Sequence, residues 1–273
     1  MRGAALDVRG AWPDVFDLAA LEAALAGTIF AGKLHFTPVT DSTNADVLDA
    51  ARSGAPGGSV YFADEQLAGR GRGDHAWHSA AGEGLYVSVL LRPRIPALRL
   101  PLLPLVAGLA VAGAIQSTAR LTVDLRWPND LMIGSRKAGG ILVETKNSGG
   151  SVDFAVVGIG INVHQRRFDS GLSTPGTSLD LESGRPIPRQ PLLVSLLKML
   201  EREAQDLVDP AAGMTIPARV EKASTWIRGR RVEVHGPQAC IGVTTGLDEC
   251  GFLLVRTEDG LVTVQTGGIR AVN

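Results

Sequence analysis

Cysteine is almost absent from this chain, and the little there is does not form a metal site. Only Cys240 and Cys250 occur among 273 residues, and neither has a His or Cys partner at the spacing of zinc ligands. The pair is therefore expected to be two buried thiols, as is usual in the reducing cytoplasm.

An excess of charge of either sign is also missing. The chain has 27 Lys and Arg against 28 Asp and Glu, a formal net charge of −1. General nucleic-acid binders ordinarily carry a basic excess, so the balance argues against that class. The chain also lacks Gly-x-x-x-x-Gly-Lys-Ser/Thr, which excludes a kinase of the P-loop type.

Long uninterrupted hydrophobic runs are lacking as well. The most apolar stretch, residues 98–115, is broken by Arg99, Pro101 and Pro104, and its later part is rich in small residues. It predicts a buried helix packed closely on a sheet rather than a membrane span. No apolar export segment precedes Asp14, so a cytoplasmic protein without a membrane partner is expected.

What is present suits a soluble enzyme with one large and one small domain, since 45% of the residues are hydrophobic. We expect helices at 17–26, 46–52, 106–115 and 191–207, and strands at 34–38, 59–65, 84–91, 121–127, 131–133, 138–146 and 154–163. The unbroken apolar run at 84–91 predicts burial on both faces. Residues 165–189, rich in Gly, Ser, Pro and Arg, predict a mobile loop. Beyond 228, short strands between turns predict a small barrel.

The most informative segment is the glycine and arginine loop at 69–77. Gly69, Gly71 and Gly73 let the backbone approach a ligand, while Arg70 and Arg72 offer planar forks of donors to a phosphate or carboxylate. Trp77 could close over such a loop as an apolar lid. A solvated basic turn beside a core tryptophan is the alternative.

A second polar segment, Asp41-Ser42-Thr43-Asn44, precedes a helical pattern. Free N–H groups at a helix start, together with these side chains, suit a ligand with polar edges or an anion. Ordinary N-capping would explain the same residues.

A third group follows a strand that ends in proline, at Arg126-Trp127-Pro128-Asn129-Asp130. Asn129 and Asp130 could contact a hard cation or position an amine, although Pro-Asn-Asp is also a common turn. Lys137, before an apolar strand, could contact an anion or could be an ordinary surface lysine.

In this order the segments resemble the biotin protein ligases, which attach biotin to a lysine of a carboxylase carrier domain. The matching residues are Ser42-Thr43-Asn44, Gln66, Gly69-Arg70-Gly71-Arg72, Trp77, Arg126-Trp127-Pro128-Asn129-Asp130, Lys137, Gly140-Ile141-Leu142-Val143-Glu144 and Gly158-Ile159-Gly160-Ile161-Asn162-Val163. The resemblance runs from about Phe36 to the C-terminus. It implies an α+β fold: a mixed sheet with flanking helices, related to class II aminoacyl-tRNA synthetases, and an SH3-like barrel. The expected domains are 1–225 and 226–273.

The resemblance also implies a two-step reaction that uses ATP and Mg²⁺, with biotin as substrate and no tightly bound prosthetic group. Biotin first attacks the α-phosphate of ATP, giving biotinyl-5′-AMP and pyrophosphate, and a lysine of a biotin carboxyl carrier protein of acetyl-CoA or a related carboxylase then takes the biotinyl group. Charge at the α-phosphate calls for fixed cations and N–H groups.

Roles for particular residues follow from the same resemblance. The catalytic candidates are Arg70, Arg72, Lys137 and Asp130, the last to orient or deprotonate the carrier amine. The biotin-binding candidates are Ser42, Thr43, Asn44, Gln66, Arg70, Gly71, Arg72 and Lys137. The candidates for ATP and the adenylate are Arg72, His75, Trp77, Asn129, Lys137, Asn162 and Arg270. Mg²⁺ is expected on the substrate phosphates, with Asn129 as a candidate contact.

The chain departs from the family inside its central motif. Many members continue the loop with further basic residues, whereas this chain has Gly73-Asp74-His75. Histidine is a shorter cation whose charge depends on pH, so weaker or more pH-sensitive pyrophosphate handling is expected.

Two other functions are compatible with parts of this sequence. Lipoate ligases and octanoyl transferases share the fold, but the loop with Trp77 and the C-terminal barrel favour biotin. A nonenzymatic ligand-binding or nucleic-acid-binding module is disfavoured by the near-neutral charge. Only about 35 residues precede the match, too few for the helix-turn-helix domain of some members, so no DNA binding is expected. The sequence leaves monomer and homodimer open.

Overall fold

The computed structural model describes residues 15–73, 75–148 and 151–272, and within them the chain forms two sheets. The larger sheet has seven strands in the order β1-β2-β3-β7-β6-β5-β4. Its strands are β1 Leu34–Thr40, β2 Val60–Gln66, β3 Gly84–Leu91, β4 Asp124–Arg126, β5 Asp130–Ile133, β6 Arg136–Ser148 and β7 Ser151–Asn162. β1 and β2 are parallel and the other pairs are antiparallel, so the expected mixed sheet is confirmed.

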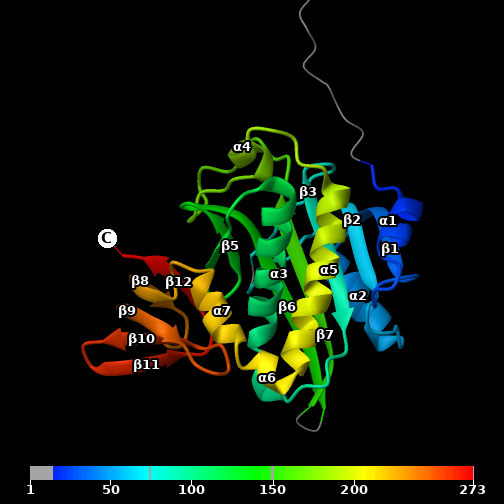
Figure 1. Cartoon of the computed structure of the whole chain (residues 1–273). Helices are drawn as coiled ribbons and strands as arrows, with labels where there is room; N and C mark the ends of the chain where they lie inside the picture. Colours follow the sequence, from blue (N-terminus) through cyan, green and yellow to red (C-terminus); the bar gives the residue numbers. More distant parts are fainter. Residues whose placement is uncertain (1–14, 74, 149–150, 273) are drawn as a thin grey trace, which may run out of the picture.

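Two long helices cover one face of this sheet. α3 (Leu102–Ala119) and α5 (Arg189–Val208) pack against each other across the strands (Figure 1). α3 is long and apolar enough to cross a membrane by composition, but most of it is buried inside the protein, which identifies it as the predicted core helix. The shorter helices are α1 Leu18–Ala24, α2 Thr43–Arg52, α4 Leu179–Ser183, α6 Pro210–Gly213 and α7 Ile216–Lys222, with a 3₁₀ turn at Ala97–Arg99.

β3 is buried along its whole length, as its apolar run predicts. Successive side chains of a strand point to opposite faces. Leu85, Val87 and Val89 face the core beneath α3 and α5. On the other face, Leu90 packs under α2, while Tyr86 and Ser88 line a cleft. One strand thus supports the core and the candidate site.

The second sheet is antiparallel, with the order β11-β10-β9-β8-β12. Its strands are β8 Arg228–His235, β9 Cys240–Leu247, β10 Leu253–Thr257, β11 Gly260–Val264 and β12 Gly268–Ala271. It lies beside the β4–β5 side of the molecule (Figure 1), where Trp127 Nε1 donates to the Gly251 carbonyl at 3.1 Å.

The structure corrects several local predictions. α2 begins at Thr43, not at 46, because Ser42 takes the extended backbone of an N-cap residue. The strand predicted at 121–127 shortens to Asp124–Arg126, and α6 and α7 were not predicted. Cys250 is buried as expected, but Cys240 is only partly buried; both thiols are free.

The prediction of a mobile loop at 165–189 was wrong for much of that segment. It contains α4, whose N-cap Ser178 accepts from Leu181 N, and Gln165, Thr177 and Ile187 are buried. The backbone of Lys137 anchors it, because Lys137 N donates to Pro175 O at 2.8 Å and Lys137 O accepts from Thr177 N at 2.9 Å. Composition alone does not reveal such long-range bonds.

Candidate functional site

A large cleft of about 1140 Å³ opens on the sheet face opposite α3 and α5. It brings together all the site residues predicted from the sequence: Ser42, Thr43, Asn44, Gln66, Arg70, Gly71, Arg72, His75, Trp77, Asn129, Asp130, Lys137, Asn162 and Arg270. These residues come from both sheets, α2 and the loop at 69–77, so the tertiary fold assembles what the sequence separates.

Glycines of β7 make room for the two central side chains of the cleft. A Cβ atom on Gly158 would lie 2.0 Å from Asn44 Oδ1, and one on Gly160 would lie 2.5 Å from Trp77 Nε1. Real Cβ atoms do not make such contacts. Trp77 therefore rests directly on the sheet as part of the cleft wall, with Lys137 Nζ 5.6 Å from its ring centroid.

The start of α2 is tied to β2 by a hydrogen-bonded cluster. Gln66 Oε1 accepts from Thr43 N at 2.9 Å and from Thr43 Oγ1 at 3.0 Å, while Gln66 Nε2 donates to Ser79 Oγ at 2.8 Å. Ser42 makes no side-chain capping bond to the first turn of α2, all of which is described. Ordinary capping therefore does not account for Ser42.

The cluster continues through Ser88, which is fully buried. Ser88 Oγ donates to Asn44 Oδ1 at 2.6 Å and lies 2.7 Å from Thr43 Oγ1. Asn44 Nδ2 donates to Glu144 Oε2 at 2.8 Å, and Arg70 Nη2 pairs with that same oxygen at 2.8 Å. An unbroken chain of polar side chains thus links Gln66 to Arg70 and holds the Asn44 amide in one orientation.

Asp130 lies between two cations. Its Oδ1 is 2.5 Å from Lys137 Nζ, and its Oδ2 is 2.6 Å from Arg126 Nη2. Burial alone would raise the pKa of Asp130, but the charges of Lys137 and Arg126 outweigh it and hold the pKa below its ordinary value. The carboxylate is therefore ionised at neutral pH and fixes Lys137 toward the cleft.

Arg72 connects the loop to the second sheet. Its Nη1 donates to Gly267 O at 2.7 Å and to Asn129 Oδ1 at 3.3 Å. Burial lowers the pKa of Arg72, and Asp130 opposes that shift. An arginine nevertheless stays protonated at any physiological pH, so Arg72 is a fixed positive charge inside the cleft.

The two candidate asparagines donate their amides to the backbone. Asn129 Nδ2 donates to Ile141 O at 2.7 Å, and Asn162 Nδ2 donates to Thr177 O at 3.0 Å. Asn129 Oδ1 accepts from the Arg72 guanidinium, whose positive charge would repel a metal ion at that oxygen. Among the described residues no group of three His, Cys, Asp or Glu side chains is placed to hold a metal.

His75 and Arg270 are exposed at the cleft, and Arg270 lies on β12 of the second sheet. Gly71 N donates to His75 O at 2.7 Å, which closes the tip of the loop. The predicted departure at Gly73-Asp74-His75 includes Asp74, which lies outside the described residues.

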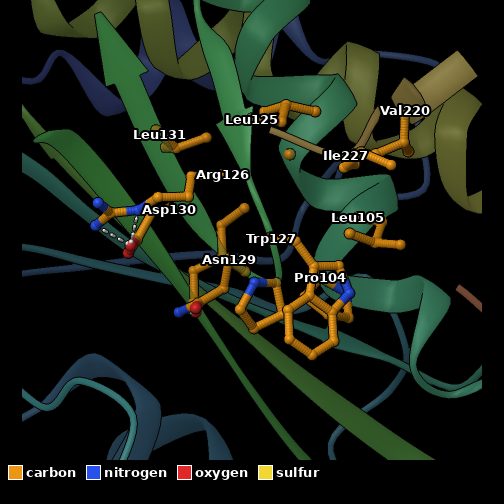
Figure 2. Close-up of a pocket in the computed structure, with 13 residues that line it drawn as sticks. Pro104, Leu105, Leu125, Arg126, Trp127, Asn129, Asp130, Leu131, Val220 and Ile227 are labelled. Carbon is orange, nitrogen blue, oxygen red and sulfur yellow. Dashed lines mark hydrogen bonds and ion pairs between the residues drawn. The ribbon is translucent and has the colours of Figure 1, made fainter. Parts of the chain in front are cut away.

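Below the cleft, the turn at 126–130 separates apolar from charged side chains (Figure 2). Trp127 is buried against Pro104 and Leu105 of α3 around a small pocket of about 10 Å³, whereas Arg126 and Asp130 form their ion pair on the other side. The Trp127–Pro128 peptide bond is cis. The motif therefore anchors the turn in the core and presents Asp130 to the cleft.

Sequence reasoning missed several cleft residues. Ser88 and Tyr86 lay inside an apolar run, and Gln165 lay in the segment predicted to be a loop. A serine within a fully buried strand was a usable signal, because a buried hydroxyl needs hydrogen-bond partners. Glu144 was part of the matched motif but received no role.

The fold and this site define a class of ligase. Residues 36–162 match the Biotin/lipoate A/B protein ligase family, and the chain belongs to that family.

Individual relatives cover most of the chain. It is 33% identical to the biotin--[acetyl-CoA-carboxylase] ligase of Mycobacterium tuberculosis, over 87% of this chain and 88% of that protein. It is 32% identical to the bifunctional ligase/repressor BirA of Bacillus subtilis, over 86% of this chain and 73% of that protein. The biotin protein ligase of Aquifex aeolicus, solved with biotin and ATP, superposes with a TM-score of 0.76 at 29% identity and covers 88% of this chain and 100% of that one.

Proposed function

We propose that this protein is a biotin protein ligase that uses ATP. It activates biotin as biotinyl-5′-AMP and transfers the biotinyl group to a lysine of a biotin carboxyl carrier domain of acetyl-CoA carboxylase or a related carboxylase. The names of its relatives support this assignment, as does the Aquifex aeolicus structure with biotin and ATP.

One observation carries the proposal. One cleft holds the donors and acceptors of Thr43, Asn44 and Gln66 together with the cations Arg72 and Lys137, and Lys137 Nζ lies 5.6 Å from the Trp77 ring centroid. A cyclic urea needs paired donors and acceptors, and a phosphate needs fixed positive charge. The cleft suits a molecule that has both.

In the first step the biotin carboxylate oxygen attacks the α-phosphorus, the bond to the bridging oxygen breaks and pyrophosphate leaves. Two anions must approach each other, so Arg70, Arg72 and Lys137 serve as charge partners rather than as nucleophiles. Glu144 holds Arg70 in the free enzyme. The substrate carboxylate takes over this guanidinium when it binds.

In the second step the neutral carrier amine attacks the acyl carbon, the bond from that carbon to the phosphate oxygen breaks, AMP leaves and the nitrogen gives its extra proton to water. The lowered pKa of Asp130 makes it a weak base, so orientation of the amine and of Lys137 is the role that fits it better. Trp77 and the loop at 69–77 shield the mixed anhydride from water.

The finer structural assignments belong to the same proposal. We assign the catalytic domain to residues 1–225 with a class II aminoacyl-tRNA synthetase-like fold and the SH3-like barrel to 226–273, supported by the start of β8 at Arg228. We place the protein in the cytoplasm.

Pyrophosphate release tests the proposal. Purified protein is incubated with MgATP and biotin, lipoate or octanoate in separate reactions, and a biotin carrier domain is then added for intact-mass analysis. We expect release with biotin alone, followed by a mass increase on the carrier lysine. Release only with lipoate or octanoate would move the assignment to that acid, and no release with any acid would overturn it.

A further inference from the structure

Trp226 is a buried tryptophan at the junction of the two sheets. It is 5% exposed and lies two residues before the start of β8. Two arginines lie over its ring: the Arg126 Cζ is 5.3 Å from the ring centroid and the Arg230 Cζ is 3.8 Å from it. Arg126 belongs to β4 of the larger sheet and Arg230 to β8 of the second sheet. The ring therefore contacts one cation from each sheet.

The backbone before β8 is fixed against β4, so the place of this ring is well defined. Leu125 N donates to Ala223 O at 3.1 Å, and Ser224 Oγ donates to Leu125 O at 2.5 Å. Trp226 N donates in turn to Ser224 Oγ at 3.0 Å. The ring is thus carried by a segment that is hydrogen-bonded to the residue before Arg126.

The Arg126 guanidinium connects this ring to the cleft. Its Nε and Nη2 donate to Asp130 Oδ2 at 3.0 and 2.6 Å (Figure 2), and Nη2 also donates to Thr174 Oγ1 at 3.0 Å. A guanidinium donates in its own plane and stacks on aromatic rings through its faces, so both kinds of contact act on it together. The other Asp130 oxygen, Oδ1, lies 2.5 Å from Lys137 Nζ. Trp226 is thereby linked to Lys137 through a guanidinium and a carboxylate.

Burial makes the ring contact important for Arg126. The Arg126 side chain is only 10% exposed, and a cation–π contact is stronger when the cation is desolvated. Without the ring, Arg126 can turn away from Asp130, and the carboxylate is then held by Lys137 alone. Lys137 would lose its fixed position, and a displacement of about 1 Å in a positioning group can cost up to about a hundred-fold in rate.

We propose that Trp226 is a positioning residue for the activation of biotin: its ring holds Arg126, and Arg126 holds the carboxylate that directs Lys137 toward the phosphates. This inference rests on the proposed function and adds to it a residue that acts only through other side chains. The ring lies two residues before β8, so it ties the position of the second sheet to the charges of the cleft.

The test compares Trp226→Leu, which removes the ring, with Trp226→Phe, which keeps an aromatic face. We expect Trp226→Leu to lower kcat for biotin-dependent pyrophosphate release about ten-fold and to leave the KM for biotin within about two-fold, because a misplaced charge partner weakens the transition state more than substrate binding. Trp226→Phe should restore kcat to within about three-fold of the wild type. Val232→Ala, at a fully buried position of β8, is the control: it loosens the second sheet and keeps kcat within about two-fold.

A double-mutant cycle shows whether Trp226 acts through Arg126. In the Arg126→Met background, Trp226→Leu should lower kcat by no more than about two-fold further. Trp226→Met, a flexible apolar side chain without a ring, replaces Trp226→Leu throughout if the latter does not fold. A wild-type kcat without the ring, an equal loss in Trp226→Phe, or the full ten-fold loss in the Arg126→Met background would overturn the inference.

Urea unfolding of the same four proteins separates this inference from the proposed function. The midpoint shift of the double variant should be smaller than the sum of the two single shifts, because both substitutions remove the same contact. Additive shifts would overturn the inference whichever acid the enzyme activates. A wild type without biotin-dependent release would reject the proposed function, and the urea cycle would still test the contact between Trp226 and Arg126.

Discussion

Gly158 and Gly160 are the residues on which the shape of the cleft depends most directly. Each lacks the Cβ atom that would occupy the place of another side chain, Asn44 in one case and Trp77 in the other. The need for glycine here is a matter of space, since neither residue has a positive φ.

We predict that Gly158→Ala raises the KM for biotin about ten-fold or more and leaves the KM for ATP nearly unchanged. The new methyl group would displace the Asn44 amide, which would then lose at least one hydrogen bond. Steady-state kinetics on both substrates would measure this. Gly57→Ala is the control, since its Cβ would make only an ordinary 3.5 Å contact. Equal changes in both KM values would contradict the prediction.

Asp130 gives a second prediction at this scale, on stability. Because its pKa is lowered in the folded state, its ion pairs stabilise the protein above the unfolded pKa of about 3.9 and this contribution is lost as the pH falls through the folded value. Asp130→Asn, which leaves two cations unpaired, should cost about 3 kcal/mol in the free energy of unfolding at pH 7.

Urea unfolding at pH 7 and pH 3 checks the sign. The gap in unfolding free energy between wild type and Asp130→Asn should narrow at pH 3, because that pH lies below the unfolded pKa of about 3.9 and protonation of the unfolded carboxyl then favours unfolding of the wild type. Asp49→Asn, which removes an exposed pair with Arg52, should change stability by less than about 1 kcal/mol at either pH. If the two proteins differed in unfolding free energy by the same amount at both pH values, the ion pairs of Asp130 would not be the source of the difference.

At the scale of elements, β3 contributes to both the core and the cleft, because its successive side chains point to opposite faces of the sheet. Ser88 and Val87 are neighbours in sequence, yet Ser88 donates to Asn44 and contacts Thr43, while Val87 packs in the core under α3 and α5. Substitution of adjacent residues should therefore produce different defects.

We expect Ser88→Ala to raise the KM for biotin by about five- to ten-fold, since Asn44 and Thr43 lose the hydroxyl between them. Val87→Ala should lower the free energy of unfolding by about 2 kcal/mol through the cavity it leaves, without a selective change in that KM. Kinetics and urea unfolding on both variants separate the two. A larger KM defect in Val87→Ala than in Ser88→Ala would contradict the two-faced description.

At the scale of the whole molecule, the second sheet completes the cleft. Gly267 O anchors Arg72, and Gly251 O accepts from Trp127 of the larger sheet's turn. Gly267 has a φ of +122°, and a Cβ there would lie 1.9 Å from His235 O. The loop that holds Arg72 therefore depends on glycine.

Gly267→Ala should raise the Kd for ATP about ten-fold and leave that for biotin nearly unchanged, because Arg72 loses the carbonyl that anchors its guanidinium. Gly260→Ala is the matched control: its φ of +131° is equally unfavourable for alanine, but no atom lies within 4 Å of its Cβ. Isothermal titration with each substrate would test this. If Gly260→Ala weakened ATP binding as much as Gly267→Ala does, general destabilisation of the second sheet would explain the effect.

The sequence by itself determined the family, most of the strands, the longer helices and a set of candidate residues that all line one cleft, because periodicity, glycine spacing and short motifs are local. Only the tertiary structure decided that Asn44 is oriented by Ser88 and Glu144, that Asp130 lies between two cations, and that Gln165 belongs to the cleft rather than to a mobile loop. Asn44 is 44 positions from Ser88 and 100 from Glu144, whereas Asp130 is only four positions from Arg126 but is brought to Lys137 by the pairing of two strands. These relations follow from sheet register and packing, which no local pattern specifies.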